Sequence, residues 1–221
     1  MGKRTITRRR GRGTVTYRAH SFRFKGGEVK HRPYDTVEKT EGVLKGTIID
    51  FKHCSGHSAP LAKVQFENKE VRYILAAEHM MLETPIESGA DASVSVGNTL
   101  PLGKIPNGSQ IYNVELVPGD GGKLCRVAGT HAIVIGKRGD HVLVEFPSKK
   151  KKELNERCRA TLGVIASGGR SDKPFVKAGT RHHLMRAKGK LYPRTSGVAM
   201  NAVDHPYGSG RGRQHAKIKV S

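Results

Sequence analysis

The chain contains no tryptophan, and only 5% of its 221 residues are aromatic. Large rings bury the most apolar area per side chain, so few residues are able to anchor a core. Hydrophobic residues reach 36%, below the roughly 45–50% of ordinary globular domains. The deficit lies mainly at the two ends, whereas the middle holds enough Val, Ile and Leu for compact cores. The chain is long enough for one large domain or two small ones.

Cysteines and long apolar runs are also scarce. The three cysteines, Cys54, Cys125 and Cys158, are odd in number and include no CxxC pair, which argues against a disulfide framework and a self-contained zinc site. Few, unpaired cysteines are typical of a reducing compartment. No apolar run approaches the roughly 20 residues that span a bilayer, and the basic start is not followed by the apolar core of a signal peptide. We expect an intracellular protein, soluble or assembled.

Acidic residues are few and unevenly distributed. Residues 1–40 carry 12 Lys and Arg against 3 Asp and Glu, and residues 166–221 carry 12 against 2. The residues between them carry 16 against 14, so the ends hold +9 and +10 of the formal +21. Basic ends on a near-neutral middle are typical of polyanion binding, because each cation placed on a phosphate releases condensed counterions. The pattern predicts a nucleic-acid partner, with a membrane surface as a distant second.

Alternating apolar residues predict short strands in the middle of the chain, separated by Gly- and Pro-containing turns. They are expected at residues 43–51, 61–66, 71–75, 111–117, 132–136 and 142–146. Only residues 76–82 and 151–157 suggest helical turns. This spacing predicts an all-β protein made of small antiparallel barrels.

A Gly- and Pro-containing segment at residues 97–103 suggests the boundary between two barrels. The predicted organisation is a basic arm at 1–40, barrels at 41–97 and 98–165, and a second, Gly-rich basic arm at 166–221. Neither arm has the apolar content to fold alone, so both are expected to order against a partner. Single aromatics such as Tyr17 and Phe22 among the arginines of the first arm favour stacking on bases over an ordinary disordered tail.

Residues 197–213 are rich in Gly and also contain Asp204, His205 and Ser209. A catalytic triad would need the Asp to orient the His and the Ser to reach it. Side chains of adjacent residues diverge in an extended chain, so we favour a loop whose bare backbone lies against RNA.

Metal binding has one weak candidate, the H-C-x-x-H run of His53, Cys54 and His57. Structural zinc takes four ligands, and no second pair stands at a suitable spacing. We predict no metal and no cofactor. The sequence is equally consistent with two interpretations of the four lysines at 149–152, a solvated loop tip and an electrostatic contact.

Six separated motifs, in the same order, resemble the universal ribosomal large-subunit protein two family. They are Arg72-Tyr73-Ile74-Leu75-Ala76, Gly97-Asn98-Thr99-Leu100-Pro101, Ile105-Pro106-Asn107-Gly108, Pro118-Gly119-Asp120-Gly121-Gly122-Lys123-Leu124, Arg159-Ala160-Thr161-Leu162-Gly163, and Gly197-Val198-Ala199-Met200-Asn201 with Val203-Asp204-His205-Pro206. Asp172-Lys173-Pro174 with Lys177-Ala178-Gly179 resembles the archaeal or eukaryotic branch. Ala202 departs from the family, which usually has Pro there.

The resemblance implies an OB-fold barrel followed by an SH3-like barrel, with both arms threaded into large-subunit ribosomal RNA near the peptidyl transferase centre. It also implies help in joining the two subunits. The expected partners are this RNA and neighbouring ribosomal proteins, while a contact with small-subunit RNA is left open. No membrane partner and no homo-oligomer are expected, and the expected location is the ribosome in the cytoplasm.

Candidate RNA contacts combine the basic residues of the arms, the Gly-rich loop, and two positions in the barrels. Arg72 belongs to a predicted strand, and Arg126 follows the Gly-rich turn that carries Lys123. The full set is Arg8, Arg9, Arg10, Arg12, Arg72, Lys123, Arg126, Arg170, Arg181, His182, Arg194, Asn201, Asp204, His205, Arg211 and Arg213.

The sequence is compatible with three different functions. The first is a structural, non-enzymatic RNA-binding constituent of the large ribosomal subunit. The second is a free nucleic-acid chaperone or transcription factor, since isolated small barrels serve such roles. The third makes His205 a general base in peptide bond formation, because neutral His has a suitable pKa.

Overall fold

The computed structural model describes residues 3–6, 8, 12, 14, 16–17, 29–34 and 42–209. The chain divides into two compact units. The first unit joins Met1–Arg23 with Phe175–Ser221, and we call it the arm unit; the second, Phe24–Pro174, is the body. The body contains every strand that the structure describes, so it carries the fold.

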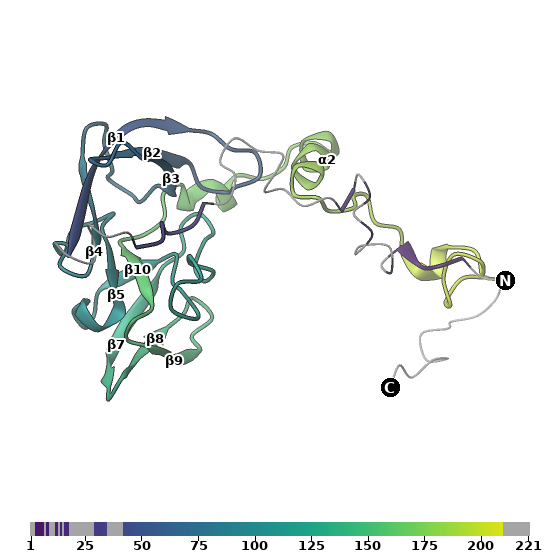
Figure 1. The fold of residues 1–221 in the computed structure, drawn as a ribbon. Coiled ribbons are helices and arrows are strands. Elements are labelled where there is room, and N and C mark those ends of the chain that lie inside the picture. Colours follow the sequence, from purple (N-terminus) through teal and green to yellow (C-terminus); the bar gives the residue numbers. More distant parts are fainter. Residues whose placement is uncertain are drawn as a thin grey trace. The chain divides into compact units, whose positions relative to one another are not determined.

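The strands of the body form one sheet in the order β3-β2-β1-β4-β5-β10-β6-β7-β8-β9 (Figure 1). Neighbouring strands are antiparallel except β4 and β5, which meet in parallel at Ser88 and Thr99. The strands are β1 (Val43–Lys52), β2 (Leu61–Phe66), β3 (Val71–Leu75), β4 (Pro85–Gly89), β5 (Thr99–Pro101), β6 (Gln110–Tyr112), β7 (Ala132–Arg138), β8 (His141–Glu145), β9 (Lys151–Asn155) and β10 (Arg159–Leu162).

This architecture confirms the all-β fold class, an OB-fold barrel followed by an SH3-like barrel. Strands β1 to β4 belong to the first barrel and β5 to β10 to the second. In β1, Gly46 allows close approach of β2, because a Cβ there would lie 2.9 Å from the Gln65 carbonyl oxygen. The register of β1 against β2 shifts between Ile48 and Asp50, which marks a bulge or irregularity in the strand.

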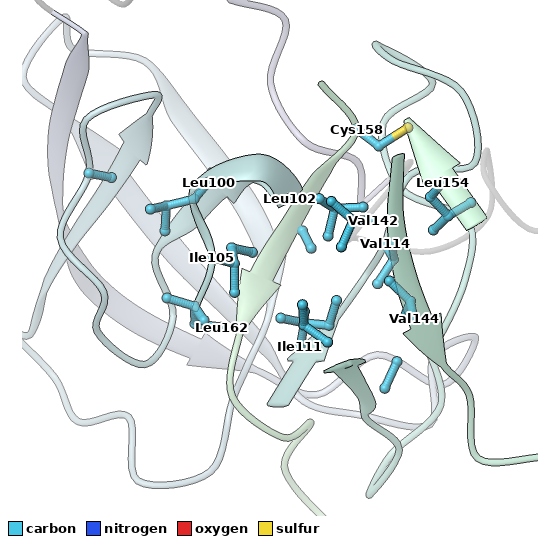
Figure 2. Packing of buried hydrophobic residues seen from close by; sticks show 14 residues of the cluster. Leu100, Leu102, Ile105, Ile111, Val114, Val142, Val144, Leu154, Cys158 and Leu162 are labelled. Atoms are coloured by element: carbon cyan, nitrogen blue, oxygen red, sulfur yellow. The ribbon is translucent and has the colours of Figure 1, made fainter. Parts of the chain in front are cut away.

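Each barrel has its own apolar core. Leu44, Ile48 and Val64 belong to the core of the first. The second barrel is filled by residues such as Leu100, Ile111 and Val144, which point inward from several strands (Figure 2). Alternate residues of the strands supply these side chains, as the period-2 pattern of the sequence predicts.

A third cluster of buried residues joins the two barrels. It brings Leu61 and Leu75 of the first barrel together with Tyr112 and Ile165, and it also includes Val29. The Tyr112 hydroxyl donates a hydrogen bond to the Leu75 carbonyl oxygen at 3.0 Å. Burial raises the pKa of this phenol, so the group remains a donor. The barrels therefore share a packed interface inside one body.

Two expected elements are wrong, and several others were missed. Residues 76–82 form turns instead of a helical segment. Residues 151–157 contain β9, because Lys151–Asn155 pairs along β8. The missed elements are strands β4, β5 and β10 and helix α2 (Ala178–Ala187). Helix α2 has no buried residue and hence no apolar periodicity to reveal it.

The strand expected at 111–117 is interrupted. Strand β6 ends at Tyr112, and Asn113 adopts a left-handed backbone with φ of 49°. Val114 then makes an isolated bridge to Leu124.

Short 3-10 helices complete the described part: η2 (Leu102–Lys104), η3 (Gly168–Asp172) and η4 (Gly197–Ala199). Across the ranges that the structure describes, no helix is long and apolar enough to cross a membrane.

Candidate nucleic-acid interface

Residues 29–34 of the expected N-terminal arm lie against the body; we call them the strap. The His31 amide donates to the Gly121 carbonyl oxygen at 2.9 Å, and Val29 is 1% exposed. Gly121 has φ of 83°, and a Cβ on it would lie 2.9 Å from the Lys30 Cβ. Only glycine fits this backbone without strain. The arm was expected to become ordered only when bound to a partner. The strap differs from that expectation, because it buries apolar surface on its own chain.

A buried ion pair lies beneath the strap. Glu115 is 0% exposed and Arg159 is 3% exposed. Glu115 Oε1 accepts hydrogen bonds from Arg159 Nη2 at 2.8 Å and Arg159 Nε at 3.1 Å. Its Oε2 accepts from the Arg159 amide at 2.9 Å. The Gly119 and Gly121 amides also donate to this carboxylate, at 3.2 and 3.0 Å. Five donors thus compensate the buried charge.

Arg159 also holds the strap directly. Its Nη1 donates to the Arg32 carbonyl oxygen at 2.5 Å, and its guanidinium carbon lies 4.5 Å from the centre of the Tyr34 ring. Burial alone raises the pKa of Glu115, but the hydrogen bonds from Arg159 outweigh it and bring the pKa below its usual value. The pair is therefore charged at neutral pH and fixes the strap on the body.

His31 adds a neutral anchor to the strap. Its Nε2 donates to the Asn113 carbonyl oxygen at 2.7 Å. Burial and the positive charge of Arg159 lower the pKa of His31 to about 4. The imidazole is therefore uncharged at neutral pH.

The barrel arginines predicted to contact RNA point to partners within the chain. Arg126 Nη1 donates to the Gly122 carbonyl oxygen at 3.2 Å, and its Nη2 donates to the Val29 carbonyl oxygen. Arg72 pairs with Glu70, which also accepts from Arg32 at 3.0 and 3.1 Å. These guanidinium groups bind elements of the body. RNA contact by Arg72 and Arg126 stays a prediction.

Lys123 differs from these arginines, because its side chain is 59% exposed although it lies 3.3 Å from Asp120. Arg126, by contrast, reaches back towards the strap, where its Nη2 donates to the Val29 carbonyl oxygen. Exposed lysines also follow at 149–152, at the start of β9, where Lys151 lies 3.9 Å from Glu145.

The arm unit combines both ends of the chain. The Lys3 amide donates to the Val203 carbonyl oxygen at 2.8 Å, and Lys3 Nζ lies 3.9 Å from Asp204 Oδ1. In α2, the guanidinium carbon of Arg181 lies 5.4 Å from the centre of the Tyr192 ring. The two arms, expected as separate segments, therefore meet in one unit.

The Gly-rich loop does not form a triad. His205 Nδ1 accepts a hydrogen bond from the Tyr207 amide at 3.1 Å, while Asp204 faces Lys3. Since Nδ1 is an acceptor, neutral His205 carries its proton on Nε2. Gly208 was expected to face RNA, but a Cβ there would lie 2.2 Å from the Asn201 carbonyl oxygen. The chain itself explains that glycine.

The remaining predicted residues are exposed or lie outside the described residues. Arg8, Arg12, Arg170, His182, Arg194 and Asn201 are exposed. Arg9, Arg10, Arg211 and Arg213 fall outside the described residues.

At the H-C-x-x-H run, His57 Nδ1 lies 3.1 Å from Cys54 Sγ, and His53 is exposed. Within the described ranges, no group of three or more His, Cys, Asp or Glu residues could hold a metal ion.

Glu115, Arg159 and Arg32 form an anchoring set that was not predicted from the sequence. One signal was present, because Glu115 interrupts the apolar residues of the strand expected at 111–117. A charge in such a pattern indicates a buried partner. The partner itself, 44 positions away, could not be identified from spacing.

Two small barrels with strongly basic terminal extensions define a class of nucleic-acid-binding proteins. Residues 2–88 match the family model described as "Ribosomal Proteins L2, RNA binding N-terminal domain", and residues 95–221 match "Ribosomal Proteins L2, C-terminal domain". The chain belongs to the ribosomal protein L2 family, in its archaeal-type branch.

Archaeal relatives cover nearly the whole chain. The Large ribosomal subunit protein uL2 of Methanothermobacter thermautotrophicus is 55% identical over 97% of this chain and 88% of its own length. The proteins of the same name from Methanosphaera stadtmanae and Methanococcus vannielii are 52% and 53% identical over 97% of this chain, and over 88% and 90% of their own lengths. The resemblance of the six motifs is therefore confirmed as family membership.

Proposed function

We propose that this chain is a structural constituent of the large ribosomal subunit that binds ribosomal RNA. The name of its relatives and the RNA-binding description of the N-terminal family model support this role. This role implies that the protein lies in the ribosome, and from that we infer a cytoplasmic location.

The distribution of salt bridges between the body and the two arms supports the proposal. In the body, several cations pair with neighbouring carboxylates, as Arg159 does with Glu115 and Lys137 with Glu156 at 2.5 Å. By contrast, Arg8, Arg12 and Arg194 are exposed and form no salt bridge among the described residues. Exposed, uncompensated cations on both arms suit a partner with a regular array of phosphates.

The finer roles extend this proposal. We infer that the two arms enter the large-subunit RNA near the peptidyl transferase region and support assembly and subunit association. Neighbouring ribosomal proteins would then contact the exposed faces of the barrels. The predicted arm cations, together with Lys123 and Asn201, are the proposed RNA contacts, and the protein acts by binding and not by catalysis.

Salt dependence tests the binding mode. If the arms neutralise about six to ten phosphates, affinity should fall on the order of 10³–10⁵-fold between 50 and 200 mM salt. Filter binding to large-subunit RNA fragments measures this slope. A flat response would contradict the proposal.

A free nucleic-acid chaperone or transcription factor would share the barrels and the salt slope. Sedimentation of a cell extract on a sucrose gradient separates the two functions. A structural constituent travels with the large particle, whereas a free factor stays near the top.

The structure weighs against His205 as a general base. Its Nδ1 already accepts the Tyr207 amide, and in the neutral ring Nε2 then carries a proton and can only donate. A general base must offer a free lone pair to the proton that it removes. Replacing His205 with Gln in reconstituted subunits should lower the yield of particles while leaving turnover per assembled particle unchanged.

A further inference from the structure

The arm unit contains a groove of about 850 Å³ built from both ends of the chain. Thr5, Ile6 and Tyr17 line it from the N-terminal side, and residues between Arg181 and His205 complete it. Both hydroxylated rings, Tyr17 and Tyr192, are partly exposed. The volume lies within the range of about 300–1,000 Å³ that is usual for small-molecule and cofactor sites.

The charge of the groove is positive. Arg181, Lys190 and Arg194 line it, and the only carboxylate among its described lining residues is Asp204. That carboxylate lies 3.9 Å from Lys3 Nζ, so its charge is partly compensated. An anionic ligand is therefore favoured over a cationic or neutral one.

A second hollow of about 330 Å³ adjoins the groove through shared walls. Lys190, Leu191 and Tyr192 line both, and His182 and Arg186 line the second one. Tyr192 thus stands between two hollows, each of which also has cationic side chains in its wall. Regularly spaced anions that carry flat, stackable groups fit this arrangement.

We propose that this groove binds an unpaired stretch of RNA, with one base stacked on Tyr192 and the adjacent phosphates on Lys190 and Arg194. Unpaired bases can be splayed onto aromatic rings and arginine planes, whereas the bases of a duplex are stacked internally. Arg181 already lies over one face of the Tyr192 ring, 5.4 Å from its centre. His205 lines the groove as well, and its Nε2 proton suits an acceptor on a base edge. This inference rests on the proposed RNA-binding function.

The absence of tryptophan allows a direct test. Tyr192→Trp in the full chain introduces a single indole whose fluorescence is quenched when a base stacks on it. The matched control is Phe175→Trp, since Phe175 is an aromatic of the arm unit that is 49% exposed and lies outside the described lining of both hollows. The probe is a 12-nucleotide single-stranded RNA of mixed sequence, compared with a duplex of the same sequence. Anisotropy of an end-labelled copy measures binding independently.

We expect saturating single-stranded RNA to quench the fluorescence of Tyr192→Trp by more than half, with weaker quenching by the duplex and little change in Phe175→Trp. Bound RNA that leaves Tyr192→Trp unquenched, or quenches both variants equally, overturns the groove while leaving the proposed function intact. An absence of RNA binding by anisotropy overturns both.

A second comparison measures affinity. Tyr192→Ala should weaken binding of the single-stranded RNA about 5- to 150-fold, the equivalent of losing one base–aromatic stack. Tyr192→Phe, which keeps the ring, should bind like the parent, and Phe175→Ala should have no effect. Equal affinity of Tyr192→Ala and the parent would overturn the proposed stack.

Discussion

Replacing Glu115 with Gln should strongly destabilise the body. The carboxylate accepts five hydrogen bonds at zero exposure. A Gln side chain has one oxygen, so its amide nitrogen must face donors from Arg159 or from a glycine amide. Breaking a buried pair and leaving the other charge uncompensated costs about 3–5 kcal/mol. This is a large part of the roughly 5–15 kcal/mol that holds a domain folded.

Urea unfolding at pH 7, followed by tyrosine fluorescence, measures the loss. With a slope of about 2 kcal/mol per molar urea, the midpoint should fall by about 1.5–2.5 M. The matched control is Glu153→Gln, whose partner Arg138 lies 3.5 Å away with side-chain exposures of 86% and 49%. An exposed pair of this kind contributes about 0–1 kcal/mol, so the control midpoint should hardly move.

Two further measurements test whether the Glu115–Arg159 network holds the strap. Adding Arg159→Gln to Glu115→Gln should recover part of the loss, because no unpaired charge then remains buried. Trypsin should also cut the strap after Lys30 sooner in Glu115→Gln than in the parent, since Arg159 holds the Arg32 carbonyl. A loss of less than about 1 kcal/mol in Glu115→Gln, with unchanged cleavage, would show that the network does not hold the strap.

His31 and Arg126 are the remaining anchors of the strap. The pKa of His31 is about 4 in the folded chain against about 6.5 unfolded, so its contribution to stability is complete above pH 6.5 and is lost as the pH falls towards 4. His31→Gln, which keeps a donor for the Asn113 carbonyl, should flatten the decline of urea midpoints across that window, and an unchanged decline would contradict this role. Arg126→Lys should lower stability by about 1–2 kcal/mol, because one ammonium does not reproduce the guanidinium fork that reaches two carbonyls. Filter binding distinguishes the two roles of Arg126: reduced RNA affinity with an unchanged urea midpoint would favour its predicted RNA contact.

Much of the function could be predicted from the sequence because charge is additive along a chain. The excess of cations in residues 1–40 and 166–221 does not depend on how the chain folds, so it indicated a polyanionic partner directly. The strands at Leu61–Phe66 and Val71–Leu75 were also predicted at their observed limits. In Leu61–Phe66, buried Val64 and Phe66 alternate with the less buried Lys63 and Gln65, so the sequence pattern has a period of two residues.

Contacts between residues far apart in the sequence determined the features that could not be predicted locally. The segment Lys151–Asn155 is a strand because β8 lies beside it, although its own lysines favoured no strand. His31 meets Asn113 across 82 positions, and Arg159 meets Arg32 across 127. Nothing in local spacing encodes such contacts, because loop closure between distant residues is settled only when the barrels pack.

The same difference between local sequence and long-range contacts applies to the arginines of the barrels. By sequence, Arg72, Arg126 and Arg159 are equivalent cations, and two of them were predicted to contact RNA. The tertiary structure places a carboxylate or carbonyl oxygens within hydrogen-bond reach of each. Of the three, Arg159 is buried, and a desolvated guanidinium must satisfy its donors inside the protein. Composition determined that this protein carries charge for a polyanion, whereas the fold decided which cations remain exposed to bind it.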